Sequence, residues 1–316
     1  MRTPAIEWFR KHPQTHNYQM TDLYTLNTIS KQAHAQALAY ERRQAGKVPY
    51  YLGLIEELRE LHPSIGLRNI YETYQPDGIG RDAFIELGKQ HGYMLEERSN
   101  PVRTTYSVKC HRYKNLLADK EFTDVNQIWS SDITYYPLSD QHFYIVFIMD
   151  VYSRKIIGYN VADNMRAENN ILALRMALTH RGIDDYHNQL IHHSDKGSQY
   201  ASDAYTELLS NHNISISMCV NVYENAHIER VNGTIKNDYL KSYNIKTFKE
   251  LTEGVKKAIN IYNDCRDHQC LPNRKTPNQF ETFLATEPSS PRPSLSIYTA
   301  KKNEQMTNQL PLTFDS

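Results

Sequence analysis

Two aspartates stand where an apolar strand pattern would place hydrophobic side chains. Asp132 lies inside the run WSSDITY, and Asp195 ends the run LIHHSD. A carboxylate in such a place costs free energy unless it has a partner or a function. Because functional residues of open α/β sheets collect at strand ends, both are candidates for one site. Gly197 follows closely and allows a tight turn or a close backbone approach there.

A third carboxylate, Glu229, lies in the predicted helix NAHIERVNGTIKNDYL. Asn225, four residues earlier, and Asn232 and Lys236, three and seven residues later, share its helical face. This stripe is polar, with one acid and one base, where a core-facing stripe would be apolar. It is therefore a candidate for the same site as the two aspartates.

Three carboxylates brought together repel one another, and divalent cations relieve the repulsion. Ligands that are oxygen atoms alone select Mg²⁺ or Mn²⁺. Two such ions about 3.5–4 Å apart can activate a nucleophile and stabilise the leaving oxygen in phosphoryl transfer. Taken singly, each acid has a simpler explanation: Asp132 could cap a turn, Asp195 could cap the next helix, and Glu229 could be solvated.

The elements that must position these residues form an α/β pattern. Three β-branched, aromatic runs are followed by helices that alternate with strands, which predicts a mixed sheet flanked by helices. The expected strands are 126–138, 142–155, 156–162, 188–195 and 214–218. The expected helices are 168–182, 201–213, 225–240 and 248–264.

The chain before this sheet is predicted to be all-α. Residues 18–46 have a helical pattern that Gly46 and Pro49 should close. Three shorter helices follow within 50–95, joined by turns at His62-Pro63 and Pro76-Asp77-Gly78. Such a unit is either a helix-turn-helix or a plain three-helix bundle, and the pattern alone does not choose between them.

Composition excludes several classes of protein. The 36 basic and 36 acidic residues give no net charge, which neither supports nor opposes a nucleic-acid partner. Four cysteines in 316 residues are no disulfide framework and indicate a reducing compartment. No apolar run is long enough to span a membrane, and the N-terminus lacks the apolar stretch of a signal peptide.

Taken together, these motifs resemble one family. From about residue 50 to residue 285, the chain resembles the OrfB-type transposases of the IS-three insertion-sequence family, which carry a retroviral-integrase-like core. The matching stretches are HRYKNLLADKEFTDVNQIWSSDITYY, FYIVFIMDVYSRKIIGYNV, LIHHSDKGSQYAS, YENAHIERVNGTIKNDYL and TPNQFE.

The resemblance implies an RNase H-like catalytic core of the DDE type. Its triad falls on Asp132, Asp195 and Glu229, which would hold Mg²⁺ or Mn²⁺, with two ions expected. Lys236 matches a basic position that faces the terminal DNA in this family. The other residues expected to face DNA are Lys196, Asn225, Asn232, Arg68, Arg81, Arg112 and Lys114, the last two in a basic linker that could instead be only solvated.

The implied organisation has five parts. They are an N-terminal helical region (1–48), a helix-turn-helix DNA-binding domain (49–98), a basic linker (99–122), the integrase catalytic core (123–285) and a loosely ordered Pro- and Ser-rich tail (286–316).

The sequence departs from the family pattern between the second and third acids. Only 33 residues separate Asp195 from Glu229, slightly fewer than usual. The shortening falls in MCVNVYENAHIE, where Val220, Asn221 and Val222 replace basic residues that the family often carries. We therefore expect the triad to assemble but the loop contacts to DNA to be weaker. Glu224, just before Asn225, is expected to cap or support the site rather than to bind metal.

The expected function is metal-dependent DNA strand cleavage and strand transfer at the ends of an insertion sequence. The expected partners are double-stranded DNA, further copies of the chain, and the product of an upstream reading frame, free or fused. The expected location is the bacterial cytoplasm, at the nucleoid. Two alternatives remain open: a catalytically inactive DNA-binding relative, and an RNase H-fold nuclease that cleaves without joining.

Overall fold

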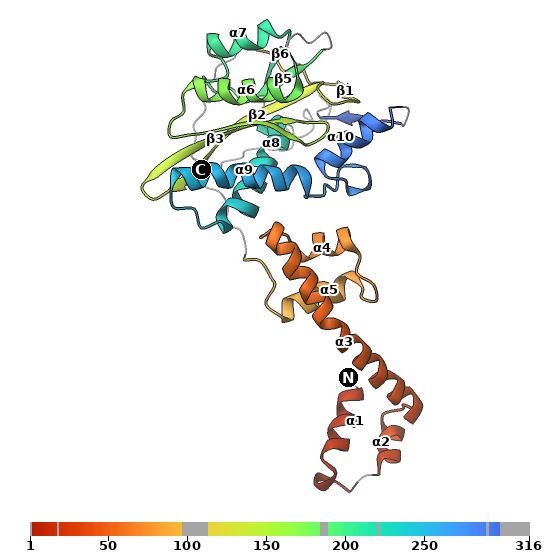
Figure 1. The fold of residues 1–316 in the computed structure, drawn as a ribbon. Helices are drawn as coiled ribbons and strands as arrows, with labels where there is room; N and C mark the ends of the chain where they lie inside the picture. Colours follow the sequence, from red (N-terminus) through yellow and green to blue (C-terminus); the bar gives the residue numbers. More distant parts are fainter. Residues whose placement is uncertain are drawn as a thin grey trace, which may run out of the picture. The chain divides into compact units, whose positions relative to one another are not determined.

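The computed structural model describes residues 2–17, 19–96, 113–183, 189–219, 222–288 and 291–297 (Figure 1). The chain forms two compact units. Unit 1 comprises Met1–Arg59 and Leu67–Met94, and unit 2 comprises Glu60–Gly66 and Leu95–Ser316. The arginine expected to contact DNA at position 112 lies outside the described residues.

Unit 1 is all-α, as the sequence predicts. Its elements are α1 (Arg2–Lys11), the 3₁₀ turn η1 (Pro13–Thr15), α2 (Met20–Leu26), α3 (Lys31–Leu61), α4 (Leu67–Tyr74) and α5 (Arg81–Gln90). The second half of α3 packs with α4 and α5 through the buried side chains of Tyr51, Ile55, Ile70 and Phe84. The short helices α4 and α5 confirm the predicted succession of helix, turn and helix.

The predicted end of the first long helix is wrong. Residues 27–30 separate α2 from α3, and α3 then runs without a break through Gly46 and Pro49. An internal proline costs about 3 kcal/mol, because it removes one backbone hydrogen bond. Tyr51 and Ile55, both fully buried just beyond it, each contribute about 1.5–3 kcal/mol when buried. Tertiary packing therefore outweighs the local helix breaker.

Unit 2 is built on a five-stranded sheet in the order β4-β3-β2-β5-β6. The strands are β2 (Ile128–Leu138), β3 (Gln141–Asp150), β4 (Ile156–Ala162), β5 (Ile191–Ser194) and β6 (Ser215–Met218). The first three form an antiparallel meander, and β5 pairs with β2 in parallel. This is the mixed sheet of the RNase H-like fold, and it confirms the predicted fold class.

Helices cover both faces of the sheet (Figure 1). On one face lie α6 (Ala167–Arg181) and α7 (Asp203–Asn211), and on the other lie α8 (Ala226–Thr234) and α9 (Phe248–Asp264). Strand β3 serves both cores, because Val146 and Ile148 pack with α6 and α7 whereas Phe147 and Met149 pack with α8 and α9. Gly158 is required on β4, since a Cβ there would lie 2.3 Å from the Ala173 carbonyl of α6.

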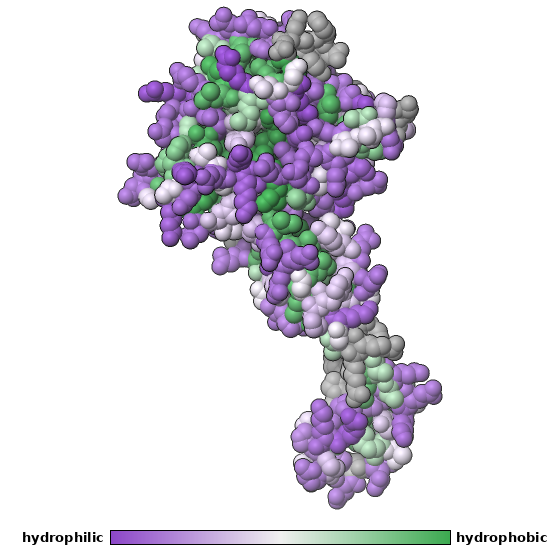
Figure 2. Space-filling view, viewed as in Figure 1, coloured by the Kyte–Doolittle hydropathy of each residue, from purple (hydrophilic) through white to green (hydrophobic). Residues whose placement is uncertain are grey.

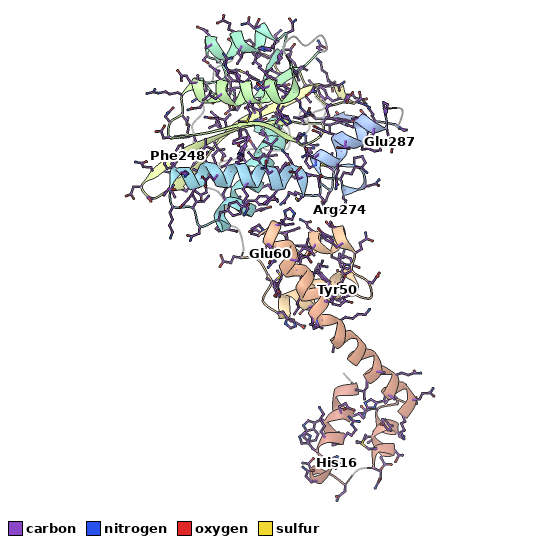
Figure 3. The ribbon with its side chains drawn as sticks, in the orientation of Figure 1. His16, Tyr50, Glu60, Phe248, Arg274 and Glu287 are labelled. Carbon is purple, nitrogen blue, oxygen red and sulfur yellow. The ribbon has the colours of Figure 1, made fainter. Side chains whose placement is uncertain are left out.

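The turns and short elements complete the unit. They are β1 (Glu121–Phe122), the 3₁₀ turn η2 (Val222–Asn225), the π-helical turn η3 (Ile235–Tyr239), the 3₁₀ turns η4 (Leu240–Ser242) and η5 (Pro272–Arg274), α10 (Pro277–Thr286) and β7 (Leu295–Ser296). Phe248 begins α9 and stacks on Phe143 of β3 at 5.1 Å between ring centroids (Figure 3).

Helix α10 and the pairing of β1 with β7 were not predicted. The motif TPNQFE lies at the start of α10, where Thr276 and Gln279 form a capping box. Strand β7 lies within the segment expected to be loosely ordered. It was not predicted because a two-residue strand carries too little pattern to be recognised.

Hydrophilic residues dominate the surface of unit 2 in the view of Figure 2, with apolar patches between them. In the described part of the chain, no helix combines the length and the apolar character of a membrane span.

Candidate active site

Strands β2 and β5 bring Asp132 and Asp195 to the same place in the sheet. They pair in parallel with Ser131 opposite Ser194, so the two aspartates are the next residues on neighbouring strands. Asp195 directly follows β5, and the chain turns there, with Oδ1 of Asp195 accepting the backbone N–H of Gly197 at 3.0 Å. A Cβ on Gly197 would lie only 3.0 Å from that oxygen, so a larger residue at this position would crowd the carboxylate.

Helix α8 is fastened to β2 by the polar stripe that the sequence identifies. The Ser130 hydroxyl donates to Oδ1 of Asn225, the residue before the helix, whose Nδ2 donates to the Ser131 carbonyl at 3.3 Å. One helical turn beyond Glu229, Asn232 Nδ2 donates to Asp132 Oδ2 at 2.7 Å. The stripe therefore follows β2 residue by residue.

Lys236 makes the last contact of this stripe. It lies in the π-helical turn that continues α8, and its ammonium group donates to Thr134 Oγ1 at 3.2 Å. The same Nζ lies 4.5 Å from the centroid of the Tyr135 ring, a cation–π contact. Strand β5 ends before this point, so the lysine can pass over the free edge of β2. Partial burial lowers the pKa of Lys236.

The three carboxylates act on one another electrostatically. Burial raises the pKa of Asp132 to about 8, and the negative charges of Asp195 and Glu229 add to the increase. Burial likewise raises the pKa of Glu229, again with a contribution from Asp195. The pKa of Asp195 is raised by desolvation and lowered in part by the Gly197 N–H. Within this group no basic side chain compensates the acids.

The donor set fits a hard divalent cation in its chemistry. Besides the carboxylates it offers Asn232 Oδ1, a buried oxygen without a hydrogen-bond partner among the described residues. As the side chains stand, the described part of the chain contains no group of three or more His, Cys, Asp or Glu close enough to hold an ion. Glu229 is exposed and can change rotamer, whereas Asp132 is fixed by Asn232.

Three residues that the sequence analysis did not single out support this site. Ser130 and Thr134 flank Asp132 on the same face of β2 and bind the α8 stripe. Ser131 points to the other face, where its hydroxyl meets Tyr200 Oη at 2.9 Å. Small polar residues at every second position around a strand aspartate were the available signal, because a strand repeats with period two.

The paired histidines of β5 are buried on opposite sides of the strand, as their spacing predicts. His192 Nε2 meets Tyr205 Oη at 2.9 Å, and His193 contacts Ser217 Oγ and Cys219 Sγ. Burial lowers the pKa of His192 to about 3 and that of His193 to about 4. Both are therefore neutral packing groups behind the acids.

The remaining predicted DNA contacts that the structure describes lie two in unit 2 and two in unit 1. Lys196 is partly buried beside Asp195, and Lys114 is exposed where its carbonyl accepts the Met218 N–H at 3.4 Å. In unit 1, Arg68 of α4 pairs with Glu72 at 3.0 Å, and Arg81 of α5 pairs with Asp82 at 2.9 Å. Both are exposed pairs within one helix, which hold their partners weakly.

Comparison with known proteins places these residues in a family context. Residues 123–222 and 213–277 match two models, each described as an integrase core domain. An uncharacterized 31 kDa protein of insertion element IS600 from Shigella sonnei is 32% identical over 66% of this chain and 78% of its own length.

Two further proteins are similar to this chain. Transposase InsF of insertion sequence IS3A from Escherichia coli is 31% identical over 53% of this chain and 58% of its own. The magnesium-bound catalytic core of HTLV-2 integrase aligns with a TM-score of 0.40 and 22% identity, over 49% of this chain and 96% of its own. The chain belongs to the family of insertion-sequence transposases that carry an integrase core domain.

Proposed function

We propose that this chain catalyses metal-dependent cleavage and joining of DNA strands at the ends of an insertion sequence. The observation that supports this most directly is the group of three acids, Asp132, Asp195 and Glu229. Burial raises the pKa of each, and the charge of Asp195 adds to the increase at Asp132 and at Glu229. Such an arrangement is costly in the protein alone and becomes favourable when a cation binds. Family membership agrees with the proposal.

In this proposal Asp132, Asp195 and Glu229 would hold Mg²⁺ or Mn²⁺, with two ions expected. The cations would supply positive charge that stabilises a phosphodiester oxygen as its bond is exchanged. Binding requires a rotation of the exposed Glu229 side chain toward the two aspartates, which the fixed position of Asp132 directs.

The chain's own groups then orient the DNA. Asn232 donates a hydrogen bond to Oδ2 of Asp132 and leaves the other carboxylate oxygen to a cation. The Gly197 N–H likewise binds Oδ1 of Asp195 and leaves its Oδ2 to a cation. The Lys236 ammonium group contacts Thr134, which lies two strand residues from Asp132, and would exchange this contact for one with a DNA phosphate. Positioning and charge neutralisation account for most of the catalysis in such reactions, and no covalent protein intermediate is needed.

The remaining parts of the chain are proposed to hold the DNA. Residues 49–98 would form a helix-turn-helix domain after the N-terminal region 1–48, with Arg68 and Arg81 exchanging their acidic neighbours for phosphates. The linker 99–122 would follow the DNA backbone to the core at 123–285, and 286–316 would be the tail. Double-stranded DNA, further copies of the chain and an upstream-frame product would be the partners, in the bacterial cytoplasm.

The test is a cleavage and joining assay with labelled DNA that carries the ends of the element. The purified full chain is incubated with Mg²⁺, Mn²⁺ or a chelator, beside a Glu229→Gln variant. We expect products that need the metal and that the variant fails to make. Cleavage without joining would indicate the nuclease alternative, and binding of the ends without reaction in any metal would indicate the inactive relative.

A further inference from the structure

The turn between β3 and β4 contains a buried arginine, Arg154, in a left-handed backbone conformation. Arg154 has a left-handed backbone, with φ at +65°, a conformation that costs a non-glycine residue about 1 kcal/mol. The turn is held by Asp150, whose Oδ1 accepts the N–H groups of Tyr152 and Ser153. The arginine is only 9% exposed, so the residues packed around it restrict its side chain as well.

The guanidinium of Arg154 has no acidic partner among the described residues. Its one hydrogen bond runs from Nη1 to Nδ1 of His227, at 2.7 Å, and its Nε has no partner. The other titratable groups that its charge reaches are His268 and Tyr262, and neither carries a negative charge at neutral pH. A buried cation is costly without a counterion, and none of the described residues supplies one.

The hydrogen bond also determines the state of His227. A guanidinium can only donate, so Nδ1 of His227 accepts and the ring proton lies on Nε2. The residue is partly exposed and lies in the first turn of α8, at the helix end whose dipole favours an anion. The exposed Arg230 stands one residue beyond Glu229, and its charge reaches the same imidazole.

We propose that Arg154, acting through His227, builds a phosphate-binding site at the first turn of α8, and that His227 Nε2–H and Arg230 contact a backbone phosphate of the bound DNA. This inference rests on the proposed function, because it assigns the anion to the DNA substrate. Arg154 is a positioning residue here: it fixes the tautomer of His227 and supplies positive charge behind it.

The position of the site favours a DNA phosphate over a small anion. His227 lies two residues before Glu229 on the same short helix, so DNA that reaches the three acids must pass close to it. A neutral imidazole and an exposed arginine bind a single phosphate oxygen weakly. A polymer that is also held at the acids would gain from this contact through its high local concentration.

The variants are chosen so that the protein still folds. Arg154→Gly suits the left-handed backbone and removes the guanidinium, and His227→Phe keeps the ring and removes both nitrogens. Arg175→Gln, an exposed arginine on α6, is the control for lost charge. The full chain is measured for binding to labelled element ends over a range of salt concentrations, and its thermal unfolding is recorded.

We expect Arg154→Gly and His227→Phe each to weaken DNA binding about tenfold, with no further loss in the double variant, because both act on one contact. Arg230→Gln should reduce the slope of log affinity against log salt by about 1, the signature of a lost phosphate contact, and Arg175→Gln should not. Unchanged affinity in both Arg154→Gly and His227→Phe would overturn the proposal.

Two further measurements keep the proposal testable if a variant unfolds. Nitrogen chemical shifts of His227 in the wild-type protein should show a protonated Nε2 and a bare Nδ1, and the opposite tautomer would overturn it. Inorganic phosphate is also titrated into the wild type and Arg154→Gly. The site is supported if the wild type does not bind free phosphate, or if Arg154→Gly loses phosphate binding together with DNA affinity. The DNA assignment is overturned if Arg154→Gly binds phosphate and its DNA affinity is unchanged.

The proposed function fails separately. If the wild type cleaves DNA and the Arg154 and His227 variants bind and cleave equally well, transposition stands and this site is wrong. If the wild type never cleaves but these variants lose DNA binding, the phosphate site stands and the catalytic proposal is wrong.

Discussion

Two aspartates on neighbouring strands of one sheet, Asp150 fully buried and Asp132 partly buried, have opposite surroundings. Asp150, at the end of β3, accepts the backbone N–H groups of Asn126, Tyr152 and Ser153 and pairs with Arg181 at 3.4 Å. Asp132, on β2, accepts hydrogen bonds from the Asn232 amide and the Ile133 backbone N–H, and it faces two further acids. Burial raises the pKa of both, to about 6 for Asp150 and about 8 for Asp132.

The difference separates a carboxylate that holds the fold together from one that we propose to bind a metal. Arg181 also holds Glu281 of α10 at 2.6 Å, so the region around Asp150 is a balanced network that fastens a turn, α6 and α10 together. The region around Asp132 lacks a balancing cation, and it lies where α8 leaves Glu229 exposed. We infer that the chain tolerates this imbalance because binding of a metal relieves it.

The largest expected effect comes from removing the charge of Asp132. Asp132→Asn should reduce cleavage and joining at least about 1,000-fold, because positioned charge carries most of the catalysis. The same variant should raise the melting temperature of the metal-free protein, on the order of 5 °C, since it removes a buried and unbalanced acid. Thermal unfolding and a single-turnover assay check the two parts, and a loss of stability would contradict the comparison.

Asp150 should respond in the opposite sense. Asp150→Asn places an amide donor among groups that all donate and leaves Arg181 with one acid fewer. We expect the protein to lose about 3 kcal/mol of stability, measured by chemical denaturation. Asp140→Asn, an exposed residue in the turn between β2 and β3, is the matched control and should change little. A stabilised Asp150→Asn protein would remove the distinction between the two regions.

The pH dependence of stability sharpens the same comparison. The pKa of Asp132 is about 8 in the folded chain, whereas its ordinary value is 3.8. Between pH 3.8 and about 8 the folded state therefore holds a proton that the unfolded state has lost. Its contribution to stability is complete below pH 4 and is lost as the pH rises toward 8. Metal-free wild type should therefore lose more stability than Asp132→Asn between pH 5 and 8, as followed by denaturation at several pH values. Parallel curves would contradict the assigned environment.

The smallest effect is expected at Tyr135. Tyr135→Leu removes the ring under the Lys236 ammonium and should reduce the rate of cleavage about two- to fivefold, the value of a cation–π contact of about 0.5–1 kcal/mol. Tyr135→Phe keeps the ring and should behave like the wild type. Equal rates for the leucine and phenylalanine variants would show that the ring does not hold the lysine.

Much of the site could be predicted from the sequence, because its signals are local. Asp132 interrupts an apolar strand, and the Asn225, Asn232 and Lys236 stripe repeats with the helical period. The contacts between this stripe and β2 follow from that pattern once the strand order is known. The sequence could not reveal Arg154, because its importance lies in a left-handed turn and in a partner 73 residues away.

The fold shows the same limit. The five strands of the central sheet and helices α6 to α9 were predicted in the correct order, because their patterns of apolar residues are strong. The continuation of α3 through Pro49 was missed because it depends on Tyr51 and Ile55, whose burial is a tertiary effect. The two-residue pairing of β1 with β7 joins segments from the two ends of unit 2, and no local pattern records it.

The most direct test of the central claim is the binding of Mn²⁺ to the full chain, measured by calorimetry at pH 8 without DNA. We predict that the wild type binds the ion and that Asp132→Asn, Asp195→Asn and Glu229→Gln each weaken binding at least about tenfold, because each removes a charged oxygen ligand. Asp150→Asn should bind as the wild type does if it remains folded. Equal Mn²⁺ affinity in the wild type and in all three variants of the acids would contradict the account.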